Sequence, residues 1–382
     1  MGVANALTGF FNASGGIPLE FGALGMRGLS LASGEVATAA PQAAFDAQGQ
    51  FLNTLTDPFA GGYRGNAPVA GLPQALGYAA AAPHDAFASI ATKAPPMVPG
   101  VEQRWRTFGA AYGGSTRIDG NAATGSHDAS GDVYGAMGGV SYAWSPDSQI
   151  GLAFGGGGTS FGLADGMGTG HSEMFQAGLF AHQGFAQKGY ISGAFAFGWH
   201  DVTTERVAPL TAERLRADYK AGVLSGRVEA GWRIDTQFAG LTPYAAVQAM
   251  SYRMPSYSEQ GNGFASSFAL DYAGRNIAAT QSELGLRLDR TEAINDALFT
   301  WRGRAAWAYD FDTVRAVDAA FQVLPGTSFV VNGAAIAPDS ALVSAGGEVA
   351  WRNGLALAAS FEGKFSSTVT SAAGKGTLRY VW

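Results

Sequence analysis

From residue 103 onward, apolar and polar side chains alternate along the chain with a period of two. In the segment 297–312, for example, Phe299 and Trp301 occupy one parity and Arg302 occupies the other. Successive side chains of a β-strand point to opposite faces, whereas a helix would spread these aromatic residues over all its sides. The pattern therefore predicts strands that have one apolar face and one polar face.

Twelve segments show this alternation, and most exceed the roughly 9–11 residues with which a tilted strand crosses a bilayer. They are 103–116, 131–145, 148–163, 171–186, 189–206, 217–236, 241–256, 276–290, 297–312, 340–352, 354–368 and 371–382. Short connections of turn-forming residues alternate with mostly longer ones. A soluble sandwich or propeller has no reason to alternate in this way, but an up-and-down barrel with long loops on one membrane side does. We predict an all-β fold, a 12-stranded antiparallel up-and-down transmembrane β-barrel.

The polar parity of these strands is expected to face the lumen. Charges of both signs at this density indicate a wet, salt-bridged interior rather than a dry packed core. Twelve strands fall between small barrels filled by side chains and open porins of about 16–18 strands, so the bore should hold one helix or one extended segment. The predicted lumen-facing residues are Arg227, Glu229, Arg233, Glu283, Arg287, Arg302, Arg304, Glu348, Arg352, Glu362 and Lys364.

Residues upstream of the barrel predict a helix followed by a linker. Ser33 is a candidate N-cap and Glu35 follows in the first turn, ahead of an Ala- and Gln-rich run that ends near residue 55. Pro41 should kink this helix or delay its start. An even number of strands places both ends of the barrel on the short-turn side. The helix, if it lies in or near the lumen, must therefore reach the first strand from that side.

The other upstream residues give weaker signals. The segment 57–100 is rich in proline and has the composition of a linker, with a short helical piece expected around 85–92. Asn5–Leu29 is Gly-rich, apolar and without clean periodicity, and we expect it to form the last short strands of something larger. The predicted units are 1–32, a remnant of an upstream region; 33–102, helix and linker; and 103–382, the barrel.

Composition excludes several classes of protein. The chain has no cysteine, which rules out a disulfide-stapled scaffold and a thiolate zinc site. Its 24 basic residues are outnumbered by 30 acidic ones and are not clustered, so we expect no nucleic-acid partner. The mean hydropathy of +0.05 is high although no apolar run approaches the about 20 residues of a membrane helix. Strands that expose every second side chain to lipid resolve that contrast.

Four stretches resemble the C-terminal translocator of bacterial autotransporters, the proteins of type V secretion. They are Ser33–Pro58, Arg104–Gly114 (RWRTFGAAYGG), Leu241–Gln248 (LTPYAAVQ) and the final TLRYVW, which carries Leu378, Tyr380 and Trp382 at alternate positions. The resemblance covers 103–382 and, less closely, 20–60. It implies an outer-membrane barrel of a Gram-negative bacterium that anchors an N-terminal passenger and helps to translocate it to the cell surface.

The resemblance also implies partners. These are outer-membrane lipid, the chain's own passenger segment, of which 1–32 would be a remnant, and the barrel assembly machinery, which would read Leu378, Tyr380 and Trp382 as its signal. The chain is expected to act as a monomer without a cofactor and not to be an enzyme. Residues 1–16 lack a charged n-region and a long apolar core. We therefore expect a fragment of a longer precursor or a missing signal.

Two other functions stay open at this point. One is a general outer-membrane porin or structural barrel. The other is a barrel hydrolase that would use rim residues such as His200–Asp201 together with His171–Ser172–Glu173. Gly155–Gly158 lacks the Lys-Ser/Thr and helix of a phosphate loop, and a steric role is expected for it. With no nucleophile elbow and no paired metal histidines in the sequence, we predict no catalytic, cofactor-binding or metal-binding residue.

Overall fold

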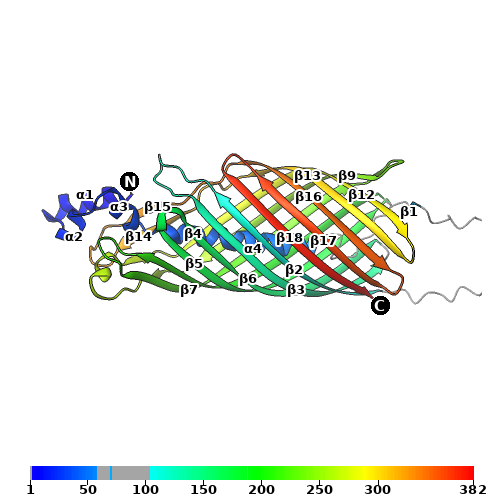
Figure 1. Ribbon diagram of the computed structural model, residues 1–382, viewed down its shortest axis with the longest axis horizontal. Helices are drawn as coiled ribbons and strands as arrows, with labels where there is room; N and C mark the ends of the chain where they lie inside the picture. The colour runs from blue at the N-terminus through cyan, green and yellow to red at the C-terminus, as the bar shows by residue number, and fades with distance from the viewer. Residues whose placement is uncertain (1, 58–68, 71–103, 146, 187) are drawn as a thin grey trace, which may run out of the picture.

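The computed structural model describes residues 2–57, 69–70, 104–145, 147–186 and 188–382. Twelve long strands form one closed antiparallel barrel (Figure 1). They are β2 (Trp105–Ile118), β3 (Ala129–Ser145), β4 (Ser148–Leu163), β5 (Gly168–Phe185), β6 (Gly189–Val207), β7 (Arg214–Trp232), β9 (Gly240–Met254), β12 (Arg275–Ile294), β13 (Ala297–Asp310), β16 (Asp339–Trp351), β17 (Leu355–Phe365) and β18 (Val369–Val381). The predicted fold is confirmed.

Strand pairing runs from each strand to its neighbour along the chain, and the last strand returns to the first. β18 pairs antiparallel with β2 from Val369 opposite Ile118 to Val381 opposite Arg106. The strands span 11 to 20 residues, and several begin earlier than the sequence pattern predicts. β5 starts at Gly168 and β7 at Arg214, because their hydrogen-bond ladders continue at the long-loop end beyond the length that a bilayer requires.

The outer face of the barrel is apolar along much of its circumference. Alternate residues of most strands are exposed there, among them Ile150, Phe154, Phe175, Leu179, Val228, Leu284, Leu357 and Phe361. A continuous apolar surface of this kind would aggregate in water, whereas hydrocarbon solvates it. The apolar parity predicted from the sequence is therefore the parity that faces outward from the barrel.

At the short-turn end, the two barrel termini meet. The backbone N–H of Trp382 donates to Trp105 O at 3.1 Å, and the N–H of Trp105 donates to Trp382 O at 3.3 Å. The two indole rings stack with their centroids 6.3 Å apart, and both side chains are exposed on the outer face. Leu378 and Tyr380 share that outward parity. The seam that closes the barrel thus ends in an aromatic pair at the level where interfacial aromatics are favoured.

The N-terminal residues are helical, which corrects the expectation of short strands in Asn5–Leu29. They form α1 (Gly2–Ser14), α2 (Leu19–Gly22) and α3 (Met26–Ala32), which lie outside the barrel at its long-loop end (Figure 1). Val3 and Leu7 stand one helical turn apart and are buried against the loops there. This spacing lets a short run of apolar residues bury one face without a partner strand.

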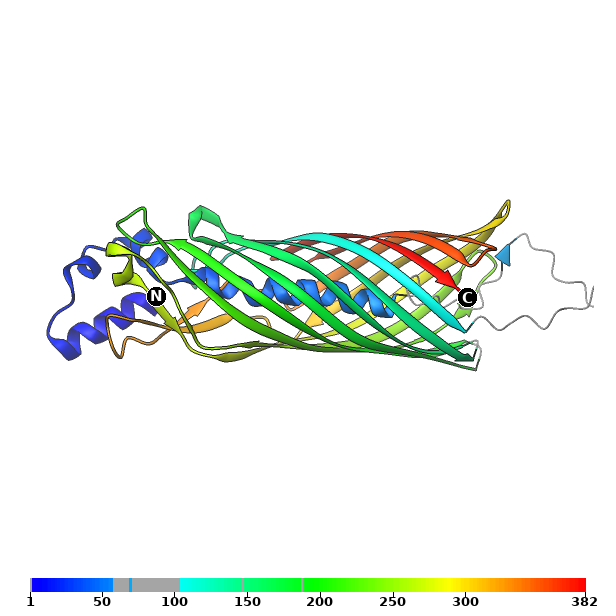
Figure 2. The ribbon, with the colours of Figure 1, turned by 90° about the horizontal axis from the view of Figure 1, so that it is seen from below.

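The predicted helix is present and begins later than Ser33. A 3-10 turn, η1 (Glu35–Thr38), precedes α4 (Ala39–Thr56), so Pro41 falls in the first turn of α4, where a backbone N–H has no partner within the helix. Figure 2 shows α4 inside the barrel, running from the long-loop end toward the short-turn end.

Of the linker, only Asp57 and β1 (Val69–Ala70) are described, and the helical piece expected at 85–92 lies outside the described residues.

Two long loops build a small sheet over the mouth of the barrel. β10 (Tyr257–Ser258), β11 (Leu270–Tyr272), β14 (Ala316–Phe321) and β15 (Phe329–Asn332) pair in that order, and η3 (Gly263–Phe268) joins the first two. Two smaller elements complete the fold, η2 (Ala164–Gly166) after β4 and β8 (Ile234–Asp235) after β7. Phe21 of α2 packs against Phe268 and Phe321, with centroids 5.1 and 4.9 Å apart. The loops and the N-terminal helices therefore share one core at the mouth.

Deleting Trp382 tests the closing seam. The deletion removes the two backbone hydrogen bonds to Trp105 and the ring pair, worth about 1 kcal/mol per bond and about 0.5–1.5 kcal/mol for the rings. We expect a lower fraction of folded, heat-modifiable protein in membranes by electrophoresis. Trp382→Phe keeps the backbone bonds and an aromatic ring and should assemble almost as well as the wild type. Equal assembly of the deletion and the wild type would show that this pair does not matter for closure.

Candidate functional site

The occupied lumen is the candidate site, and α4 is its occupant. Phe51 and Leu52 of α4 are completely buried, as is Ala47 one turn earlier. The helix packs mainly along β3 to β7 and β9, so it lies against one side of the barrel wall. A helix satisfies its own backbone hydrogen bonds, and this lets it lie in a pore without taking any from the wall.

Three glycines in the wall make room for the helix. A Cβ at Gly178 would lie 2.8 Å from Leu55 Cδ1 and 2.9 Å from Phe51 Cε1. A Cβ at Gly155 would lie 3.2 Å from Phe51 Cε2, and one at Gly198 would lie 2.6 Å from Gln48 Oε1. Side chains at these positions on β5, β4 and β6 would displace the helix. The steric role expected for the run 155–158 is explained at Gly155 by Phe51, whereas Gly157 and Gly158 lie close to Tyr134 of the neighbouring strand.

A chain of amide and hydroxyl groups ties α4 to the same wall. Gln48 Nε2 donates to Ser225 Oγ at 2.8 Å, and Gln48 Oε1 accepts from Gln176 Nε2 at 2.9 Å. Tyr112 Oη in turn donates to Gln176 Oε1 at 2.8 Å. These buried polar groups satisfy one another, which avoids the cost of leaving a donor or acceptor unpaired.

Two cavities lie beside the helix. A cavity of about 170 Å³ surrounds the C-terminal end of α4, and its lining includes Asn53, Thr56, Asp57, Arg302, Ser344 and Ser360. A second, of about 130 Å³, lies further toward the mouth and is lined in part by Gln42, Asp46, Gln50, Gln281, Asp310 and Lys364. Asn53 Nδ2 donates to Glu362 Oε1 at 3.3 Å beside both cavities. The helix thus leaves part of the bore unfilled.

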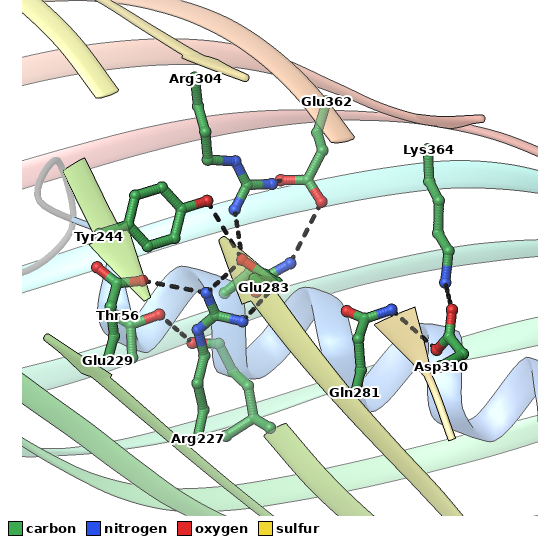
Figure 3. Close-up of polar contacts among 12 residues, drawn as sticks. Thr56, Arg227, Glu229, Tyr244, Gln281, Glu283, Arg304, Asp310, Glu362 and Lys364 are labelled. Atoms are coloured by element: carbon green, nitrogen blue, oxygen red, sulfur yellow. Dashed lines mark hydrogen bonds and ion pairs between the residues drawn. The ribbon is translucent and has the colours of Figure 1, made fainter. Parts of the chain in front are cut away.

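A network of buried charges faces the helix from β7, β12, β13 and β17 (Figure 3). Arg227 donates from Nη1 and Nη2 to both oxygens of Glu283, at 2.7 and 2.9 Å, and Nη2 lies 3.1 Å from Glu229. Arg304 Nη2 donates to Glu362 at 2.8 Å.

Arg287 belongs to the same network. It pairs with Glu229 and lies over the ring of Tyr244, 4.4 Å from its centroid. Each carboxylate in the network is held by at least one guanidinium, as charges removed from water require.

Further ion pairs extend this network along the lumen. Arg233 donates to Asp289 at 2.6 Å, Lys364 to Asp310 at 2.8 Å and Arg379 to Glu348 at 3.0 Å. Lys375 of β18 pairs with Asp57, the residue that follows α4. The interior therefore contains all but one of the predicted lumen-facing residues, and Arg302 lines the larger cavity.

Arg352 is the exception and corrects the predicted set. It follows β16 in the turn before β17, its side chain is 78% exposed and its nearest acid is Asp296 at 3.8 Å. The alternation of the strand no longer applies once the chain has entered the turn. Sequence reasoning also missed Arg379 and Lys375, although both stand at the parity opposite Leu378 and Tyr380 and could have been found from it.

The residues considered for a hydrolase do not form a catalytic rim. His200 is buried inside the barrel, whereas Asp201 is exposed on the outer face, as adjacent strand residues must be. His200 Nδ1 lies 3.4 Å from Ser172 Oγ, and that hydroxyl lies 2.9 Å from Thr159 Oγ1. His171 and Glu173, on either side of Ser172, are exposed on the outside. The strand geometry therefore separates the proposed histidine and carboxylate.

At the mouth, several loops close around the chain between α3 and α4. Glu35 is buried there and accepts from the backbone N–H of His127 at 2.8 Å, and its other oxygen lies 2.6 Å from His127 Nδ1. Burial raises the pKa of Glu35 above its usual range, and the contacts with His127 partly oppose that shift. Val36, Ala37 and Thr38 are buried as well. The mouth thus encloses the segment that leads into α4.

Neither a membrane-spanning helix nor a metal site is found among the described residues. In the part of the chain that the structure describes, no helix is both long and apolar enough to cross a membrane. The same residues contain no group of three or more His, Asp or Glu side chains placed to hold a metal ion.

A closed barrel with an apolar outer face, a charged lumen and one helix threaded through it defines a class, the membrane-spanning barrels that enclose a segment of their own chain. The autotransporter beta-domain family model matches residues 107–362, which is more than half of the chain. The chain therefore belongs to the autotransporter beta-domain family, and its barrel is an autotransporter barrel.

Relatives of known sequence and structure agree with this family. The chain is similar to an extracellular serine protease from Serratia marcescens, with 25% identity over 252 residues, covering 64% of this chain and 23% of the relative. The chain thus spans about a quarter of that relative, and the two match through the autotransporter region. The protease activity in the relative's name is therefore not carried over to the barrel.

Two solved structures share the fold. The translocator domain of autotransporter NalP from Neisseria meningitidis aligns with a TM-score of 0.59 and 11% identity, covering 73% of this chain and 89% of that one. The beta domain of the Bordetella autotransporter BrkA aligns with a TM-score of 0.57 and 18% identity, covering 73% and 100%.

Gly178→Ala tests the packing of α4 against the glycines of the barrel wall. The added Cβ would meet Leu55 and Phe51 below 3 Å and would also lie 3.1 Å from Phe195 O, so both helix and wall must move. We expect a loss of about 1–3 kcal/mol, typical of overpacking, measured as the urea midpoint of the inserted barrel. Gly374→Ala is the matched control, because no atom lies within 4 Å of its added Cβ. Adding Phe51→Leu should recover part of the loss, and equal midpoints for both alanine variants would contradict the proposed packing.

Glu283→Gln tests the charge network. The amide cannot neutralise Arg227, which is 2% exposed and would keep only its contact with Glu229 at 3.1 Å, and breaking a buried ion pair costs about 3–5 kcal/mol. We expect a correspondingly lower urea midpoint. Arg352→Gln removes a charge from an exposed turn and should shift stability by no more than about 0.5 kcal/mol. A similar loss in both variants would mean that net charge, and not the buried pair, is responsible.

Proposed function

We propose that this barrel lies in the outer membrane of a Gram-negative bacterium, where it anchors an N-terminal passenger and helps to translocate it to the cell surface. The path of α4 is the observation that carries this proposal. The helix begins at the mouth beside α1–α3 and runs along the lumen, and it ends inside the barrel with its C-terminal end directed toward the short-turn end, where β2 begins. Because α4 runs from the mouth toward the short-turn end, the residues upstream of α4 lie on the long-loop side of the membrane.

The same geometry supports the proposed partners. Lipid would contact the apolar outer face, and the passenger would be the continuation of α1–α3 at the mouth. The barrel assembly machinery would recognise β18, whose Leu378, Tyr380 and Trp382 point outward beside the seam that must close last. Because one chain closes the barrel, we propose that it works as a monomer, with no enzymatic role for its lumen.

A tag-accessibility experiment tests the direction of this path. One epitope tag is placed ahead of Gly2 and, in a separate variant, another is inserted in the turn at Asn353–Gly354. We expect protease added to intact cells to remove the N-terminal tag, because the mouth would face outward. The turn tag should be cleaved only after the outer membrane is permeabilised. Cleavage of the turn tag alone in intact cells would reverse the proposed orientation, and protection of both tags would argue against surface delivery.

A further inference from the structure

The mouth of the barrel contains a buried polar site that is separate from the ion-pair network of the lumen. We call it the exit clamp, and it consists of Arg206 at the end of β6, Glu259 after β10 and Tyr272 in β11. Arg206 is completely buried and donates from Nε and Nη2 to the two oxygens of Glu259, at 2.7 and 2.6 Å. Tyr272 Oη lies 3.2 Å from the same carboxylate. The clamp joins the barrel wall to the sheet that covers the mouth.

The chain itself completes the hydrogen bonding of the clamp. Arg206 Nη1 donates to the backbone oxygen of Leu31 at 2.7 Å. Tyr272 Oη lies 3.2 Å from the backbone oxygen of Gly34, so that carbonyl can accept from the tyrosine hydroxyl. A buried guanidinium donor without an acceptor is costly, so Arg206 Nη1 depends on the Leu31 carbonyl. The single proton of Tyr272 Oη can go either to Gly34 O or to Glu259, so the Gly34 carbonyl adds a second acceptor to the clamp.

Gly34 makes this contact specific to one register of the chain. Its φ of +66° lies in the left-handed region, and a Cβ there would lie 2.1 Å from Tyr272 Oη and 2.6 Å from Leu270 Cδ1. A shift of one residue would bring Ser33 or Glu35 to this position, and both carry a Cβ. The next glycine upstream is Gly28, so no nearby register offers a substitute.

The residues that follow Gly34 are held by other loops. A Cβ at Gly168 would lie 2.8 Å from Val36 Cβ, and one at Gly333 would lie 2.2 Å from Thr38 Oγ1. These two glycines belong to the start of β5 and to the loop after β15, and Glu35 contacts His127 on a third loop. The fit around the turn therefore comes from several separate parts of the mouth.

We propose that the exit clamp is a binding site for the Gly34 turn of the chain's own N-terminal segment and that it sets the register at which the passenger comes to rest in the barrel. This inference rests on the proposed function. While the chain moves outward, successive residues pass Arg206 and Tyr272. The turn at Gly34 supplies both carbonyls and the missing Cβ, and none of the five residues before it lacks a Cβ. The clamp then holds α4 in its place beside Gly178 and Gly198.

Cross-linking of the full chain reads out this register. Asn53→Cys and Glu362→Cys replace side chains that lie 3.3 Å apart beside the two cavities, and the chain contains no other thiol. The probe is dibromobimane, which fluoresces when both of its ends have reacted. In this background, Gly34→Val should lower cross-linking about ten-fold, since a shift of one residue turns a helical side chain by about 100°. Gly25→Val, with no atom within 4 Å of its Cβ, is the matched control and should leave cross-linking unchanged.

Tyr272→Phe provides a second variant in case Gly34→Val does not assemble. It removes the hydroxyl beside Gly34 O but keeps the ring that stacks on Tyr257 at 4.6 Å, and we expect a roughly two-fold loss of cross-linking. Heat-modifiability identifies the variants that have inserted. Unchanged cross-linking in inserted Gly34→Val, or in Tyr272→Phe where the valine variant fails to insert, would overturn the clamp. A wild-type chain whose N-terminal tag stays protected in intact cells would instead overturn the proposed function.

Discussion

Backbone hydrogen bonding in hydrocarbon is the constraint on which the rest of this structure depends. No water can pair with an exposed strand edge there, so β18 must pair with β2 along its whole length. Closure then assigns each parity of every strand to lipid or to the lumen. The charged residues of β7, β12 and β13 are consequently enclosed, and they must find partners among themselves. The ion-pair network of Arg227, Glu229, Glu283 and Arg287 follows from closure as much as from any function of the pore.

The two sides of the barrel wall make different contacts with α4. Along β4, β5 and β6 the wall recedes at Gly155, Gly178 and Gly198, and neutral side chains contact the helix there, with Gln176 bonded to Gln48. On the other side the wall carries paired charges and leaves two cavities between itself and the helix. Because the buried arginines are neutralised by acids of the wall, α4 need not carry matching charges. An Ala-rich helix with few charges therefore fits a highly charged barrel.

The sequence was sufficient for the features that depend on local alternation. Strand number, the order of long and short connections, the inward parity and the lumen helix all follow from periodicity and turn residues. Contacts between distant segments could not be read in this way. Gly178 looks like any other strand glycine until Phe51 lies against it, and Arg206 gives no sign of its pairing with Glu259. The helices of 2–32 were misjudged because a short apolar run without clear periodicity fits either structure until its packing partner is known. Arg352 was misplaced because a strand and its turn cannot be separated to the residue by alternation alone.

Register information is distributed unevenly along the segment that the barrel encloses. In the lumen, Ala40, Ala43, Ala44 and Ala47 present small side chains that resemble one another, and the register of the helix depends on a few larger residues, Gln48 beside Gly198 and Phe51 beside Gly178. At the mouth, the contacts depend on two particular carbonyls and on the missing Cβ of Gly34. A pore through which a polypeptide passes must accommodate many different sequences while the chain moves. When the chain comes to rest, at least one position must bind one particular part of that sequence. The barrel combines the two: much of the surface of α4 is alanine, whereas Gly178 and Gly198 in the bore and the Gly34 turn at the mouth each fit one position of the chain.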